Sequence, residues 1–204
     1  MNIKLFNKYP IFACNSYLIY ENDHCLLIDC GYFSNEMKNE IHKFKYFDGV
    51  IITHKHFDHI AGLINLKQEF NDIKIYSYMN NDDFLHDGKL NASYYMLENI
   101  VTFNGEVNNI LEGNNKIGIF NFNIMYTPGH SSDSLIIIFN DVIFVGDLIF
   151  HYSHGRTDLW TSSPIQMQES LLKIKKLFDM KKYYIYPGHD ESFYSNDCYV
   201  INKI

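Results

Sequence analysis

The stretch from Gly49 to Gly62 reads GVIITHKHFDHIAG and carries four potential metal ligands within six positions. These ligands are the side chains of His54, His56, Asp58 and His59. The apolar run at residues 50–52, just before them, predicts a short buried strand. The ligands then fall where a central strand ends and a loop begins, which is where open α/β sheets place their binding sites. The stretch therefore predicts an α/β fold with a metal site at a strand end.

The spacing within this cluster has a direct physical interpretation. His54 and His56 are two positions apart, so in an extended chain they point to the same side and can bind one ion together. Asp58 and His59 follow after the chain turns, where they can reach a second ion. Imidazole nitrogen and carboxylate oxygen suit zinc and also iron or manganese. A lone His-X-His motif would be weak evidence, because surface and core histidines are common, but the full cluster after an apolar strand is far more specific.

Three further ligand candidates each follow an apolar strand in the second half of the chain. They are His130, Asp147 and His189, and each comes directly after a glycine. A glycine at such a position lets the backbone pass close to a crowded centre. One such occurrence would be ordinary. Three of them, combined with the first cluster, make coincidence a poor explanation.

The composition limits the classes of protein and partner. With 204 residues, 47% of them hydrophobic, residues 1–204 are expected to form a single domain with a proper core. A net charge of -7 without a Lys/Arg block argues against a nucleic-acid partner. We expect no signal peptide and no membrane span, because no apolar run approaches ~18 residues. The four cysteines lack a Cys-X-X-Cys pairing, which predicts free thiols and a cytoplasmic location.

In the first half of the chain, the hydrophobic pattern predicts strands at residues 3–6, 11–20, 25–29 and 73–76, and helices at 36–44 and 63–70. Asp29, at the end of the third strand, either buttresses the metal loop from behind or forms a turn. Residues 80–105 are polar and irregular, which predicts a lid or a binding loop with short helical turns. Four aromatic residues in this loop either line a substrate cleft or cap the core: Phe84, Tyr94, Tyr95 and Phe103.

In the second half, the pattern predicts a strand pair that breaks at Asn123 and a hairpin that turns at Asn140 and Asp141. A final strand is expected at residues 183–186. The clearest helix is expected at residues 163–180, with Ser163 as its cap and Pro164 in its first turn. Its apolar stripe is predicted to contain Ile165, Leu171, Leu172, Ile174, Leu177 and Phe178.

Four segments resemble the successive motifs of the metallo-β-lactamase superfamily: THKHFDHIAG at 53–62, TPGHS at 127–131, GD at 146–147 and PGH at 187–189. Within that superfamily, GRTD at 155–158 is similar to the glyoxalase II-like and persulfide dioxygenase-like branches. The resemblance implies a four-layer αββα sandwich with the site at one edge of its two sheets. Full-length glyoxalase II enzymes add a C-terminal helical segment that holds glutathione. Only residues 191–204 follow the last motif and Asp190, so we expect a short glyoxalase II-like protein with no assigned glutathione specificity.

The resemblance also implies the ligand assignment and the cofactor. One metal would be held by His54, His56 and His130, the other by Asp58, His59 and His189, with Asp147 bridging both. The cofactor would be two divalent ions, with zinc preferred and iron or manganese as alternatives.

The implied activity is hydrolysis of a small-molecule thioester by a metal-bridged hydroxide, with Asp58 as the catalytic residue that orients the nucleophile. The alternatives are a mononuclear iron persulfide dioxygenase, a lactonase that uses the same site, and a non-catalytic metal-stabilised binding protein. A β-lactam substrate fits the fold, but the expected lack of an export signal argues against it.

The candidates for substrate contacts lie after the Asp147 strand. Arg156 is placed to grip a substrate carboxylate, or else it pairs internally with Asp158. Tyr152 and Trp160 are candidate pocket walls on position alone. His151 and His154 either line the cleft or belong to an exposed loop.

Overall fold

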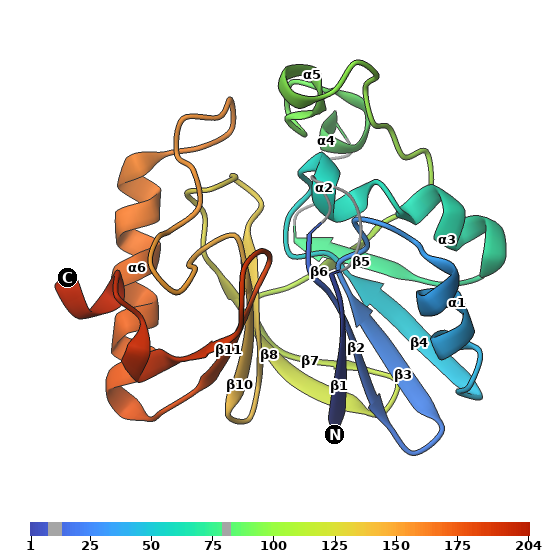
Figure 1. The fold of residues 1–204 in the computed structure, drawn as a ribbon, viewed down its shortest axis with the longest axis horizontal. Coiled ribbons are helices and arrows are strands. Elements are labelled where there is room, and N and C mark those ends of the chain that lie inside the picture. The colour runs from blue at the N-terminus through green and yellow to red at the C-terminus, as the bar shows by residue number, and fades with distance from the viewer. Residues whose placement is uncertain (8–13, 79–82) are drawn as a thin grey trace. The chain divides into compact units, whose positions relative to one another are not determined.

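The computed structural model describes residues 1–7, 14–78 and 83–204, and it contains two mixed six-stranded sheets with flanking helices (Figure 1). Its contacts divide the chain into two compact units. Unit 1 comprises Met1–Ile110 and Lys116–Phe120, and unit 2 comprises Leu111–Asn115 and Asn121–Ile204. The single domain expected from the sequence stays a prediction. Within the described ranges, no helix combines the length and the apolar character that a membrane crossing requires.

The first sheet has the strand order β1-β2-β3-β4-β5-β6. Its strands are β1 (Asn2–Phe6), β2 (Ser16–Glu21), β3 (His24–Ile28), β4 (Tyr46–Ile51), β5 (Ile75–Tyr78) and β6 (Asn108–Ile110). The first three pair antiparallel, whereas β3, β4, β5 and β6 pair parallel. The strands predicted in this half are confirmed with three differences in their bounds. β5 begins two residues later than expected, β2 begins at Ser16 so that Cys14 and Asn15 precede it, and residues 11–13 lie outside the described ranges. Sequence reasoning missed β6, because its residues Asn108 and Asn109 do not have a strand-like composition.

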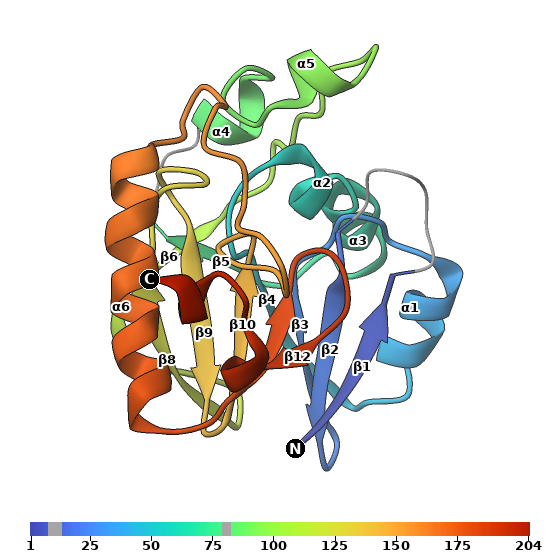
Figure 2. The same ribbon diagram turned by 60° about the vertical axis from the view of Figure 1, so that its left-hand side comes forward.

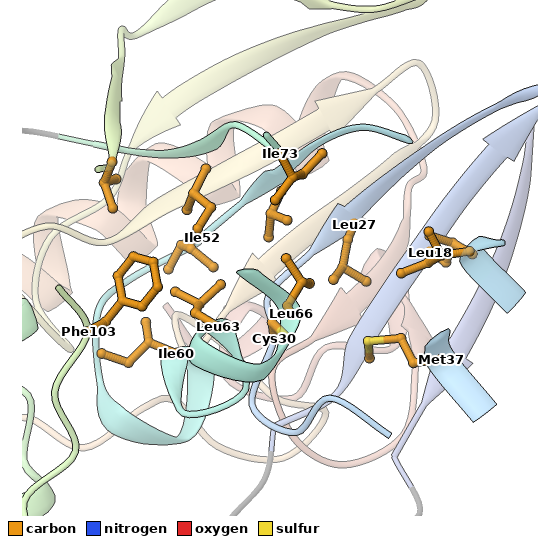
Figure 3. Packing of buried hydrophobic residues seen from close by; sticks show 14 of the residues in the cluster. Leu18, Leu27, Cys30, Met37, Ile52, Ile60, Leu63, Leu66, Ile73 and Phe103 are labelled. Carbon is orange, nitrogen blue, oxygen red and sulfur yellow. The ribbon is translucent and has the colours of Figure 1, made fainter. Parts of the chain in front are cut away.

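The helices of unit 1 are α1 (Asn35–Ile41), α2 (Phe57–Ile60), α3 (Leu63–Glu69), α4 (Asp83–His86) and α5 (Ser93–Met96). Figure 3 shows the apolar core between the sheet and the helices α1 and α3, where Leu18 and Leu27 from the strands meet Met37, Leu63 and Leu66 from the helices. Ile52 and Ile60 belong to the same core, and each is 1% exposed. Because these two residues flank the histidine-rich segment, that segment is anchored by buried side chains at both ends.

Residues 83–105 contain the two short helices that the pattern predicted in this part of the chain. Their aromatic residues fall into two classes. Phe84 and Phe103 are 2% and 3% exposed, so they cap the core. Tyr94 and Tyr95 are 56% and 49% exposed, and their rings pack edge to face against each other.

The second sheet has the strand order β12-β11-β10-β9-β8-β7. Its strands are β7 (Gly113–Ile117), β8 (Phe120–Tyr126), β9 (Leu135–Phe139), β10 (Val142–Gly146), β11 (Tyr184–Pro187) and β12 (Phe193–Tyr194). The predicted hairpin is confirmed as β9 and β10, with Asn140 at φ 50° in the turn. Figure 2 shows α6 (Pro164–Met180) lying along this sheet, and Ser163 caps it by accepting a hydrogen bond from the Gln166 backbone N–H. Two short 3-10 turns, Ser195–Asp197 and Ile201–Lys203, end the chain.

Two predictions for this half are wrong in detail. The strand break expected at Asn123 lies earlier, because Gly118 adopts φ 55° and makes the turn, while β8 runs on through Asn123. The apolar stripe of α6 also excludes two residues assigned to it: Ile165 is 72% exposed and Leu172 is 42% exposed. Helical spacing from Met167 explains the difference, since the positions four, seven and ten residues later are buried: Leu171, Ile174 and Leu177.

Candidate metal centre

Four ligand-type side chains of unit 1 follow β4, which pairs in parallel with β3 on one side and β5 on the other. We call them the N-terminal ligand set: His54, His56, Asp58 and His59. The three imidazoles are at most 3% exposed, and the His54 ring centre lies 4.7 Å from that of His56 and 4.0 Å from that of His59. The Asp58 Oδ2 lies 3.9 Å from the His59 Nε2. Buried imidazoles and a carboxylate gathered this closely form a donor set for a transition metal ion.

The Asp29 carboxylate contacts the Nδ1 side of the His59 ring. Its Oδ2 lies 2.9 Å from the His59 Nδ1, and its two oxygens accept the Thr53 backbone N–H at 2.7 Å and the Thr53 hydroxyl at 2.8 Å. An ionised carboxylate only accepts hydrogen bonds, so Nδ1 carries the proton and Nε2 is the ligand atom. Asp29 also has φ 56°, a left-handed backbone conformation. Asp29 therefore turns the chain and also contacts His59, which is a predicted metal ligand.

We expect Asp29→Asn to weaken metal binding about 10- to 100-fold, as loss of such an outer carboxylate does in other metal sites. The amide donates a hydrogen bond to Nδ1 as readily as it accepts one, so the His59 tautomer is no longer fixed. Competition with a chromophoric chelator measures the affinity. The matched control is Asp48→Asn, because Asp48 makes an equivalent 2.8 Å contact with His24 away from the ligand set. Equal affinities in the two variants would contradict this role of Asp29.

Three ligand-type side chains of unit 2 form the C-terminal ligand set: His130, Asp147 and His189. They follow β8, β10 and β11, and the parallel pairing of β10 with β11 brings Asp147 and His189 to one edge of the sheet. The Asp147 Oδ2 lies 3.4 Å from the His130 Nε2 and 3.6 Å from the His189 Nε2. One carboxylate oxygen thus faces two imidazole nitrogens, which is the arrangement that a shared metal ligand needs.

The loop that carries His130 is tied to its surroundings by polar contacts. The His130 Nδ1 lies 3.0 Å from the Arg156 carbonyl oxygen. A carbonyl only accepts, so Nδ1 carries the proton and Nε2 is left to bind metal. The Ser162 hydroxyl donates to the His130 carbonyl at 2.6 Å. Gly129 has φ 141°, and a Cβ there would lie 2.4 Å from the Met167 backbone N, so this glycine is needed for the loop to approach α6.

The donor chemistry of both sets fits metal ions. Together they offer five imidazoles and two carboxylates. Neutral imidazole and carboxylate donors suit divalent zinc, iron or manganese. For His59 and His130, the contacts at Nδ1 leave Nε2 as the nitrogen that could bind a metal ion.

The candidate substrate contacts lie in exposed parts of unit 2. Arg156 donates two hydrogen bonds of 2.9 Å to Asp158, so the structure shows the internal ion pair, and the Arg156 guanidinium holds the pKa of the Asp158 carboxyl below its ordinary value. Within the part of the chain that the structure describes, the contact between Arg156 and the predicted ligand His130 is made by the main-chain carbonyl of Arg156. Tyr152 and Trp160 are 72% and 68% exposed.

Of the two additional histidines in this region, His151 stacks its ring on Tyr152 at 4.1 Å and on Phe193 at 5.2 Å. His154 is exposed, and its Nδ1 lies 2.8 Å from the Gly155 carbonyl oxygen. These contacts favour a role in the packing of an exposed loop.

Sequence reasoning missed three neighbours of the ligands. Thr53 directly precedes the N-terminal ligand set and completes the Asp29 network. The Phe150 ring centre lies 6.2 Å from that of His189. The Cys14 sulfur lies within 4.8 Å of ligand-type atoms of Asp29 and His59. Burial raises the pKa of the Cys14 thiol, so it is a neutral neighbour here. The sequence does not distinguish Cys14 from the other three cysteines, and in the structure all four are free and buried.

Comparison with known proteins places this arrangement in a family. Residues 9–189 match the profile described as the metallo-beta-lactamase superfamily. A hydroxyacylglutathione hydrolase of Francisella tularensis subsp. novicida (strain U112) is 33% identical over 181 residues, which are 85% of this chain and 62% of the relative. The chain thus spans less than two thirds of that relative's length. A probable metallo-hydrolase of Bacillus subtilis (strain 168), YqgX, is 34% identical over 156 residues, 74% of this chain and 72% of the relative.

A solved structure, TTHA1623 in a di-iron-bound form, superposes with a TM-score of 0.77 at 24% identity and covers 91% of each chain. At that identity the likeness shows the fold alone, and it confirms the predicted α/β metallo-β-lactamase fold. The matched profile spans all seven predicted ligands, from His54 to His189. The profile, which matches residues 9–189, shows that the chain belongs to the metallo-β-lactamase superfamily, and the fold and the two histidine- and aspartate-rich ligand sets agree with that assignment.

Proposed function

We propose that the protein hydrolyses a small-molecule thioester at a centre of two divalent metal ions formed by both ligand sets. In this proposal His54, His56 and His130 would hold one ion, Asp58, His59 and His189 would hold the other, and Asp147 would contribute to both. The observation that carries the proposal is the position of the Asp147 Oδ2, 3.4 Å and 3.6 Å from the Nε2 atoms of His130 and His189. Zinc is the preferred ion, with iron and manganese as alternatives.

When bound, such ions lower the pKa of a coordinated water and polarise a carbonyl group. The chain's own residues position the reactants. Asp58, whose side chain is 16% exposed, accepts a hydrogen bond from the attacking oxygen and orients it toward the acyl carbon. Asp29 keeps the His59 ring in place, and the Arg156 carbonyl does the same for His130. This mechanism needs no nucleophilic cysteine, in agreement with the burial of Cys14 at 2% exposure.

The thioester class is supported by the relative named hydroxyacylglutathione hydrolase. Because the chain spans 62% of that relative, we carry over the acyl thioester and leave the thiol part of the substrate open. Arg156 belongs to the motif that the sequence shares with the glyoxalase II-like branch, but its side chain is 58% exposed and paired with Asp158. We therefore propose Asp58 as the catalytic residue and assign Arg156, Tyr152 and Trp160 no essential step.

The test of the proposed function is metal content by elemental analysis, on protein purified without added metal or chelator. We expect about two zinc ions per chain, followed by turnover in a thioester panel that begins with lactoylglutathione. Protein stripped with a chelator and reconstituted with zinc provides the control, and it must lose and regain turnover.

Other outcomes would overturn this proposal in defined ways. One iron per chain, with oxygen consumption in the presence of a persulfide, would assign the dioxygenase reaction instead. Two metals with turnover of lactones but not thioesters would assign a lactonase. Metal near zero, with no turnover after metal addition, would refute both the hydrolase and the dioxygenase.

A further inference from the structure

Lys55 is a charged residue in an unusual place, between the two ligands His54 and His56. It is 1% exposed and is among the largest fully buried side chains of the described residues. Side chains alternate along an extended backbone, so Lys55 points away from the side shared by its two neighbours. Burial of an ammonium group is unfavourable unless nearby groups compensate it. The burial of Lys55 therefore requires a physical explanation, and Lys55 has no role in the proposed hydrolysis.

The contacts of the ammonium supply that explanation. The Lys55 Nζ donates a hydrogen bond of 3.3 Å to the Tyr78 carbonyl oxygen and lies 5.7 Å from the centre of the Phe84 ring. Tyr78 ends β5, and Phe84 belongs to α4, where it is 2% exposed. A cation over a desolvated aromatic ring is attracted by the ring's negative face. One buried group thus links the ligand loop, residues 53–59, to both β5 and α4.

A second contact joins the same two parts of the chain. The Phe57 backbone N–H donates to the Asn91 carbonyl at 2.8 Å. Asn91 is fully buried, and its amide donates to the Val101 carbonyl at 2.8 Å, while the Phe103 N–H donates to the Leu85 carbonyl at 2.9 Å. Residues 83–103 are therefore held together by hydrogen bonds within the segment. In Figures 1 and 2, α4 lies at the same end of unit 1 as α2, which contains the last residues of the ligand loop.

We propose that Lys55 is a positioning residue that clamps the ligand loop onto residues 83–103 and so holds the His54 and His56 rings in their metal-binding orientation. The inference rests on the proposed metal centre. The expected direction of the change in metal affinity separates this proposal from a purely electrostatic effect. A fixed positive charge near a metal site opposes cation binding, so removal of charge alone would tighten binding. Loss of the clamp would weaken it, because the rings would have to be ordered by the metal itself.

The experiment compares metal-free variants by chelator competition. Lys55→Met keeps the length of the side chain and removes the ammonium, and it is expected to weaken binding of the first ion about tenfold. Lys55→Arg keeps a charged donor and is expected to restore much of the affinity. The matched control is Lys67→Met, because the Lys67 ammonium also donates to two backbone carbonyls, those of Asn71 and Ile73 at 2.7 Å and 2.9 Å. We expect that control to bind like wild type.

Two further readouts separate positioning from a general loss of structure. The cobalt(II) visible absorption of Lys55→Met should change, since it reports the ligand geometry, and amide hydrogen exchange should rise in residues 83–97. Should Lys55→Met not fold, Phe84→Leu removes the ring beneath the ammonium while it keeps an apolar side chain. It should weaken binding in the same direction by a smaller factor.

Unchanged or tighter binding in Lys55→Met would overturn the proposal, and so would an equal loss in Lys67→Met or unchanged binding in Phe84→Leu. Wild-type protein that binds no metal in the same titration would instead refute the proposed metal centre itself.

Discussion

Replacement of Asp147 by Asn is expected to remove one of the two metal ions and nearly all hydrolysis. The Asp147 Oδ2 lies 3.4 Å from the His130 Nε2 and 3.6 Å from the His189 Nε2, so it is the carboxylate placed to serve both ions. An amide of the same shape lacks the negative charge. We expect kcat/KM for the best thioester to fall at least about 1,000-fold, equivalent to about 4 kcal/mol of transition-state stabilisation. Elemental analysis and steady-state kinetics on the same preparation measure both effects.

The matched control for this variant is Asp158→Asn. Asp158 is an aspartate of unit 2 whose side chain is 68% exposed and paired with Arg156. Its replacement should leave the metal content unchanged. Retention of two ions and of turnover in Asp147→Asn would show that Asp147 does not bridge a metal pair. Equal metal loss in both variants would point to a general effect of lowered negative charge on unit 2.

Gly155→Ala is expected to be strongly destabilising, because the added methyl group would collide with the backbone beside two predicted ligands. A Cβ at Gly155 would lie 2.0 Å from the Asp147 carbonyl oxygen and 2.9 Å from the His130 Nδ1. Backbone must move to admit it, and the neighbouring Arg156 carbonyl, which fixes the His130 ring, moves with it. We expect the free energy of unfolding to fall by about 2–4 kcal/mol, in the range of severe overpacking. Urea unfolding of metal-free protein measures this, and elemental analysis should show lowered metal content.

The control for this variant is Gly113→Ala. Gly113 has φ 101°, but a Cβ there would meet no atom within 4 Å. This substitution therefore isolates the cost of backbone conformation from that of collision. It should destabilise the protein less and leave the metal content at the wild-type value. If Gly155→Ala kept its metal and unfolded no more easily than the control, the close packing around His130 would have no role in metal binding.

The positions of the predicted ligands could be read from the sequence because each follows a short apolar run. A run that is buried on both sides is recognisable without any contact information, and the polar residue after it must lie at a sheet edge. This reasoning placed His54, His130, Asp147 and His189 after strands before any contact was known. It also found α6, because Ser163 and Pro164 are strong local start signals.

The wrong predictions concern positions where the local sequence pattern indicates one structure and the packing of the folded chain produces another. Asn123 resembles a turn residue, yet it lies within β8 and pairs with Ile138 of β9. Gly118 already makes the turn, and the alternating side chains of β8 are buried on one face. The stripe of α6 was assigned by hydrophobicity. Which apolar residues are buried depends on the orientation of the helix against the sheet, so Ile165 and Leu172 remain exposed. Isolated aromatics such as Trp160 carry no periodic signal at all.

The family, the order of the strands that precede the predicted ligands, and the residue types of those ligands could be predicted from short contiguous motifs. The groups that support the predicted ligands could be identified only from the folded chain. The Asp29 carboxylate reaches His59, 30 positions further along the chain. The Arg156 carbonyl reaches His130, 26 positions away, and the Lys55 ammonium reaches the Tyr78 carbonyl, 23 positions away. Such partners are chosen by strand pairing and core packing, which bring together residues whose separation along the chain leaves no local pattern.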